Sequence, residues 1–242
     1  MIEKTEVTCP SGLVGQVRGL KTKEVTLLTD PKSLKNGKVV DDLISTCWLE
    51  TTNPGPYSLD ASGKLDWGKV LAGDRYYALL KIREATYGEE YSFKYQCSEV
   101  SCRHKYEWEL EFDALPVKTL SDESMETFKN GNSFEVDING TKVVYRLQTG
   151  DGEQKAAKLM KRYPNSKLAP ALASRIVSIE GVEPNKIVEF IDDLPLGVLR
   201  KLLKAFDATD CGVNTTIEVE CPKCGNVEEI ELPLGKEFWL PS

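Results

Sequence analysis

Residues 216–225 read Thr-Ile-Glu-Val-Glu-Cys-Pro-Lys-Cys-Gly, an alternating strand that leads into the pair Cys221 and Cys224. Cys-Pro-x-Cys-Gly is typical of a zinc knuckle, a tight turn that offers two thiolates to one metal ion. Structural zinc almost always has four ligands, so one cysteine pair leaves its coordination incomplete. The stretch therefore predicts a second pair of ligands elsewhere in the chain.

A stretch with the same plan lies near the middle of the chain. An alternating strand over residues 91–96 leads into Cys97, four residues separate Cys97 from Cys102, and a Glu-rich strand over residues 106–112 follows. Both stretches then end at Leu-Pro. Such a repeated unit indicates two facing hairpins that together supply four sulfur ligands, as in zinc ribbons. We therefore predict one structural Zn²⁺ site with these four ligands: Cys97, Cys102, Cys221 and Cys224.

Two alternatives remain open for the cysteine pairs. The wider spacing in the first pair makes His104, the only histidine, an alternative ligand in place of Cys102. Both pairs can also be buried thiols in hairpins that hold no metal. Because four protein ligands leave no open coordination position, a catalytic metal is not expected. The remaining cysteines are isolated in sequence and are expected to be small hydrophobic residues: Cys9, Cys47 and Cys211.

The rest of the chain combines strand and helix patterns. The dipeptide Asn139-Gly140 between two alternating runs predicts a tight β-hairpin. Apolar residues at helical spacing predict a helix over residues 71–87. After Gly152 the pattern becomes helical and rich in Lys, Leu and Ala. Four short helices are expected there: residues 153–162, 169–179, 184–191 and 196–206.

These elements predict an α+β fold, with small antiparallel sheets, a four-cysteine zinc-ribbon-like element and an inserted helical bundle subdomain. The Gly-Asp-Gly stretch at residues 150–152 marks the expected junction. We predict one α+β domain that contains the zinc ribbon and consists of residues 1–150 plus 211–242. The helical insertion is predicted to span residues 151–210.

Charge and hydropathy narrow the classes of function. The chain of 242 residues has a formal net charge of −7, which disfavours broad phosphate binding because such binding needs clustered Lys and Arg. A basic run along one side of the helix predicted at residues 153–162 leaves a zinc-ribbon nucleic-acid-binding protein as the alternative function. No stretch approaches the roughly 20 apolar residues of a membrane helix, and the charged start is not a signal peptide. We therefore expect no membrane partner. We also expect the thiols to be reduced, as they are in a cytoplasm.

An enzymatic role is not expected. The chain contains no nucleophile elbow, P-loop, dinucleotide fingerprint or metalloprotease helix. The paired carboxylates Asp41-Asp42 and Asp192-Asp193 lie at predicted helix ends, where they complement the helix dipole or are solvated.

The aromatic tail Phe238-Trp239-Leu240 has two interpretations, packing on its own sheet or insertion into a partner.

An ordered set of short motifs extends over most of the chain. Leu-Ile-Ser-x-Cys spans residues 43–47, Asp-Arg-x-x-x-Leu-Leu-x-x-Arg spans residues 74–83, and Tyr-Gly-x-x-Tyr-x-Phe spans residues 87–93. Thr-Gly-Asp-Gly-Glu follows at residues 149–153, before the Cys-Pro-x-Cys-Gly knuckle and the aromatic tail. Taken together, the set resembles the T-even-type base plate protein family, which comprises baseplate hub subunits and hub assembly proteins of contractile-tailed phages.

The resemblance implies a non-enzymatic role in building the central hub of a phage tail baseplate. The implied partners are other phage tail and baseplate hub proteins, and the residues expected to contact them are Phe238, Trp239 and Leu240. The implied locations are the tail baseplate of the virion and the host cytoplasm during assembly.

Overall fold

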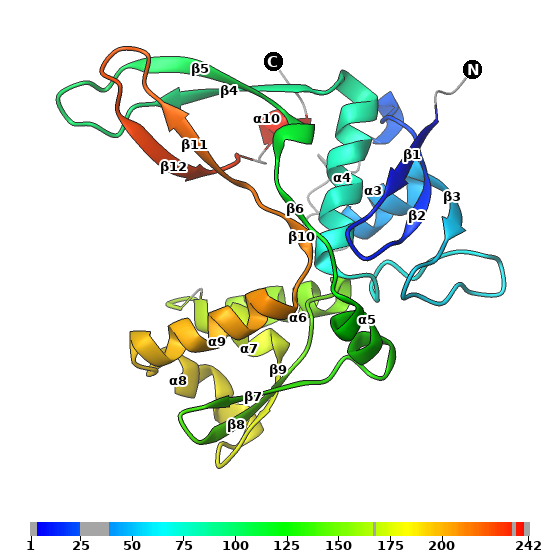
Figure 1. The fold of residues 1–242 in the computed structure, drawn as a ribbon, viewed down its shortest axis with the longest axis vertical. Helices are drawn as coiled ribbons and strands as arrows, with labels where there is room; N and C mark the ends of the chain where they lie inside the picture. Colours follow the sequence, from blue (N-terminus) through cyan, green and yellow to red (C-terminus); the bar gives the residue numbers. More distant parts are fainter. Residues whose placement is uncertain (1–3, 25–38, 167, 234–235, 240–242) are drawn as a thin grey trace.

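The computed structural model describes residues 4–24, 39–166, 168–233 and 236–239. Within these residues the chain forms small antiparallel sheets and short helices that gather into three hydrophobic clusters (Figure 1). The predicted α+β class is confirmed, and the four paired cysteines lie together.

The N-terminal unit is a three-stranded antiparallel sheet with helices packed against it. Its strands are β1 (Thr5–Thr8), β2 (Val14–Val17) and β3 (Trp48–Asn53), in the order β1-β2-β3. The helices are α3 (Val39–Cys47) and α4 (Ala72–Tyr87), and α4 confirms the helix predicted from its apolar spacing. Alternate strand residues and one side of each helix form the buried cluster, which includes Val7, Leu13, Val17, Ile44, Val70 and Ile82.

Two hairpins, here called the ribbon, form the second unit. Strand β4 (Glu90–Gln96) pairs with β5 (Lys105–Glu111), and β11 (Thr216–Glu220) pairs with β12 (Val227–Glu231). The two hairpins lie one above the other, with the short helix α10 (Lys236–Trp239) nearby (Figure 1). Their buried cluster consists of Leu80, Tyr91, Phe93, Phe112, Leu115, Val219, Leu232 and Phe238.

A second three-stranded sheet begins the third unit. Its strands are β7 (Phe134–Ile138), β8 (Thr141–Tyr145) and β9 (Ile176–Ile179). They pair in the order β7-β8-β9. The predicted Asn139-Gly140 turn joins β7 and β8, and both turn residues have positive φ, at 57° and 83°. A two-residue hairpin turn of this kind requires positive φ at both positions, which explains why Asn and Gly stand there.

Helices share one core with this sheet, and together they are here called the helical unit. Its helices are α5 (Asp122–Lys129), α6 (Gly150–Arg162), α7 (Leu168–Arg175), α8 (Ile187–Asp192) and α9 (Leu196–Thr209). Their apolar faces join β7, β8 and β9 in a single buried cluster. The predicted domain division assigns β7 and β8 to the other domain, so the boundary near residue 150 stays a prediction.

One helix prediction is wrong at its end. The helix predicted over residues 169–179 stops at Arg175, and the chain continues as β9. Strand β9 pairs with β8, where Ile176 is opposite Tyr145 and Ile179 is opposite Val143. The β-branched side chains suit a pleated, buried surface, and this pairing outweighs the local helical pattern.

A pair of very short strands explains why the two hairpins of the ribbon meet. Strand β6 (Val117–Lys118) follows β5 and pairs with β10 (Gly212–Val213), which precedes β11. The backbone N–H of Asn214 extends this pairing by donating to the carbonyl of Pro116 at 2.8 Å. The β6–β10 pair therefore brings the segment after β5 close to the segment before β11, although the two are distant in sequence (Figure 1).

Candidate metal centre

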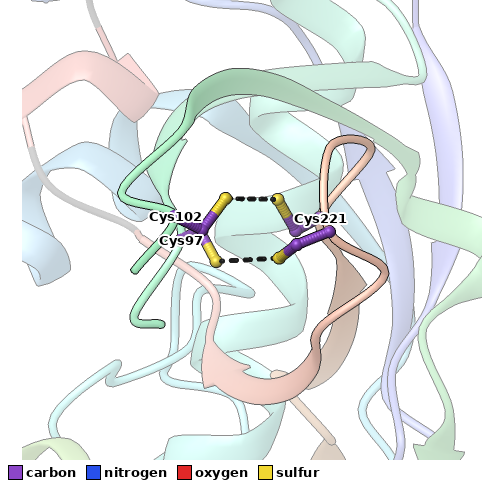
Figure 2. A group of neighbouring side chains, drawn as sticks. Cys97, Cys102 and Cys221 are labelled. Carbon is purple, nitrogen blue, oxygen red and sulfur yellow. Dashed lines mark hydrogen bonds between the residues drawn. The ribbon is translucent and has the colours of Figure 1, made fainter. Parts of the chain in front are cut away.

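The four predicted cysteines converge at the tip of the ribbon. The Sγ atoms of Cys97 and Cys224 lie 3.7 Å apart, and those of Cys102 and Cys221 lie 3.8 Å apart. All four sulfurs lie within 4.8 Å of one another, and all are free thiols (Figure 2). Sulfurs about 2.3 Å from a tetrahedral ion are separated by about 3.8 Å, so these distances match a tetrahedral four-sulfur shell.

The two knuckles have the same backbone plan despite their different lengths. In the first knuckle, the N–H of Cys97 donates to the carbonyl of His104 at 2.9 Å. In the second, the N–H of Cys221 donates to the carbonyl of Asn226 at 2.8 Å. The residue after the second cysteine has positive φ in both, at 47° for Arg103 and 70° for Gly225. The two additional residues of the first knuckle are taken up in a turn ahead of Cys102. The repeat visible in sequence is therefore also a repeat of geometry.

The electrostatics of the cluster favour a cation. Burial raises the pKa of Cys221, but the backbone N–H groups of Cys224 and Lys223, together with neighbouring thiols, lower it to about 7. The N–H of Asn226 lowers the pKa of Cys224, yet burial and the other three thiols raise it to about 12. Burial likewise raises the pKa of Cys97. Cys221 thus ionises more readily than an ordinary thiol, whereas Cys97 and Cys224 resist ionisation, and a bound divalent cation would relieve that resistance.

The alternative ligand lies outside this cluster. His104 is not a member of the four-sulfur group, and its ring stacks on Tyr106 with ring centroids 6.1 Å apart. Among the described residues, the four cysteines are the group of side chains that can hold a metal ion. The three isolated cysteines lie in other parts of the fold, where Cys9 and Cys47 are buried and Cys211 is half-buried.

The aromatic tail docks on its own chain. Phe238 is 2% exposed and contacts the rings of Tyr91 and Phe112 edge-on. Arg83, buried under four aromatic rings, donates through Nε to the carbonyl of Phe238 at 3.1 Å, and Tyr87 donates to the carbonyl of Trp239 at 2.9 Å.

Of the three tail residues expected to contact a partner, Phe238 is buried, because its ring packs in the core of the ribbon. Trp239 is half-buried, and Leu240 lies outside the described residues. The sequence alone leaves packing and insertion open, because it does not locate the aromatic cluster that receives the tail.

A family model described as T4 bacteriophage base plate protein matches residues 2–238. No curated protein and no solved structure matches the chain. None of the helices formed by the described residues combines the length and the hydropathy that crossing a bilayer requires.

Proposed function

The chain belongs to the T4 bacteriophage base plate protein family, and from this premise we propose that it is a non-enzymatic baseplate hub protein that binds other hub proteins. The observation that carries the proposal is the family match, because it extends over residues 2–238 and includes every unit of the fold. Membership in a baseplate structural family places the protein in the virion tail. Host cytoplasm is the proposed site of its assembly.

Zinc is the proposed cofactor, with Cys97, Cys102, Cys221 and Cys224 as its ligands. The sulfur separations of 3.7 and 3.8 Å support this assignment, because they match a tetrahedral shell of the size that Zn²⁺ forms with thiolates. With all four positions filled by protein, the ion has a structural role: it fastens the C-terminal hairpin to the middle of the chain.

The charge of the ribbon favours protein over nucleic acid as a partner. The outward positions of β5 carry one cation, Lys105, followed by Glu107, Glu109 and Glu111, all exposed, and β12 adds exposed Glu229 and Glu231. A ribbon that contacts phosphates needs cations on such faces. The exposed lysines of α6 leave nucleic-acid binding as a testable second function.

The hub proposal is tested by reconstitution with purified tail and baseplate proteins of the same phage. We expect a stable complex with at least one hub protein in size-exclusion chromatography and density for this chain in cryo-EM maps of the tail or of a hub intermediate. Failure to associate with all of them would overturn the proposal. Nucleic-acid binding is tested separately at low salt, where absence of binding removes that second function.

A further inference from the structure

Glu228 is a charged residue on the inner side of the ribbon. Along β12, Val227, Glu229 and Glu231 are exposed, whereas Glu228 and Ile230 are half-buried. Its cross-strand neighbour on β11 is Val219, which is fully buried. A half-buried carboxylate beside a buried apolar side chain loses part of its hydration, which hydrogen bonds can replace.

The contacts of Glu228 reach across the ribbon to the first knuckle. Its Oε1 accepts from the backbone N–H of Ser98 at 3.2 Å, and Ser98 directly follows Cys97. Tyr95 lies on β4, the strand that leads into this knuckle, and burial together with the neighbouring Glu228 carboxylate raises the pKa of its hydroxyl. One carboxylate thus ties the strand after the second knuckle to the residue that follows the first cysteine.

A contact between the two hairpins near the sulfurs can contribute to metal binding. Each hairpin is a two-stranded sheet, which is marginally stable alone, and each supplies only two of the four ligands. Ions bind more tightly when their ligands are held in place beforehand, because less freedom is lost on binding. Contacts that link the two knuckles without the ion therefore contribute to metal affinity.

We propose that Glu228 is a positioning residue that holds the two knuckles together and presets the four sulfurs for the metal. The inference rests on the proposed metal centre, and Glu228 itself is not a ligand. It acts through the backbone N–H of Ser98, which directly follows Cys97 in the loop that carries this ligand.

Simple electrostatics predicts the opposite effect for a substitution. A divalent ion with four thiolates carries a net negative charge, so a nearby carboxylate repels the loaded site. Loss of the Glu228 charge should then leave metal affinity unchanged or raise it. A lower affinity after substitution is therefore specific to the positioning role.

The test compares Glu228→Ala and Glu228→Gln with Glu229→Ala in the full-length chain. Glu229 is the matched control, because it is the next residue on β12 and has the same charge, but its side chain is exposed. Affinity for Zn²⁺ is measured by competition with a chelator, and the Co²⁺-loaded proteins report tetrahedral sulfur coordination in their absorption spectra. We expect Glu228→Ala to lose about 10- to 100-fold in affinity and Glu229→Ala to lose none.

Glu228→Gln keeps the shape of the side chain and one acceptor, so it should lose less affinity than Glu228→Ala and remain folded. Equal affinities for wild type, both Glu228 variants and Glu229→Ala would overturn the inference and leave the metal centre standing. A wild-type protein that binds neither Zn²⁺ nor Co²⁺ would overturn the metal centre and the inference together.

Discussion

The ribbon and the helical unit are stabilised by different means. Among the residues that the structure describes, the core of the helical unit contains 18 buried residues drawn mainly from a sheet and several helices, whereas the ribbon cluster contains 8, one of which belongs to α10. The helical unit can therefore rely on apolar burial, but two separate two-stranded hairpins cannot. We therefore expect the ribbon to depend on its sulfur cluster and on its aromatic tail.

Surface charge widens this difference. In the ribbon, Glu90 is paired directly with Glu111, and Glu218 with Glu229. Like charges at directly opposed positions destabilise an antiparallel pair. A region that carries such pairs with a small core needs a strong cross-link, and this is the reason to expect metal dependence there and not in the helical unit.

Metal removal gives the largest expected effect. Chelation, or Cys221→Ser, should cost most of the bound zinc and unfold the ribbon, because structural zinc contributes apparent binding free energies of about 10–16 kcal/mol. Hydrogen exchange should rise across β4, β5, β11 and β12 and stay low in β8 and α9. Metal content measured by mass spectrometry should fall from about one ion per chain.

The matched control for this substitution is Cys211→Ala. Cys211 is a half-buried thiol outside the sulfur cluster, so its loss should leave zinc content unchanged. If chelation raised exchange equally in the ribbon and the helical unit, the two regions would form one cooperative unit, and the contrast drawn between them would be wrong.

Truncating one large buried side chain in each region gives the next largest effect. Phe238→Ala should destabilise the ribbon by about 3–5 kcal/mol, because it empties the site enclosed by Tyr91 and Phe112. Leu202→Ala in α9 should destabilise the helical unit by about 2–5 kcal/mol. Denaturant unfolding of the zinc-loaded proteins, followed by region-resolved NMR, should show each loss in its own unit. An unchanged ribbon in Phe238→Ala would refute the docking of the tail.

Acid should separate the two regions. Hydrogen bonding from Ser98 lowers the pKa of Glu228, so its contribution is complete above its ordinary pKa of 4.5 and is lost as pH falls below it. Burial raises the pKa of Asp210 in spite of Arg175, so protonation of Asp210 favours the folded helical unit as pH falls. Protons also compete with metal for the thiolates. NMR during an acid titration should therefore show ribbon signals disappearing first; the reverse order would contradict this.

Some elements of the fold were predictable from local sequence patterns. Asn139-Gly140 fixes a hairpin because few other dipeptides adopt two positive φ values, and the structure confirms it. The end of α7 was not predictable, because β9 forms only when β8 is available to pair with it. Which strands share a core with the helices of residues 151–210 is likewise decided by packing over long sequence distances.

The candidate site was predictable to the same extent. The ligand number of zinc and the two knuckle patterns suffice to predict that four cysteines lie close together, and in the structure they do: Cys97, Cys102, Cys221 and Cys224. The role inferred for Glu228 was not predictable, since in sequence it is one of several acidic residues on an alternating strand. Only the register of β12 shows that this glutamate, and not its neighbours, turns inward.

The smallest expected effect tests whether the two knuckles are equivalent. Gly225 has a φ of 70°, and an added Cβ there would meet only Glu220 Oε1, at 4.0 Å, so Gly225→Ala should cost about 1 kcal/mol through backbone strain alone. Arg103 adopts a similar φ of 47° without being glycine, so Arg103→Gly should stabilise the ribbon by about 0.5 kcal/mol, after the entropy of glycine in the unfolded chain is subtracted. Gly63→Ala is the control, because its φ is 77° in a turn outside the ribbon. Unfolding midpoints of the ribbon should move in opposite directions for the two knuckle variants and not at all for the control; two shifts of the same sign would mean that the left-handed residues have different roles in the two turns.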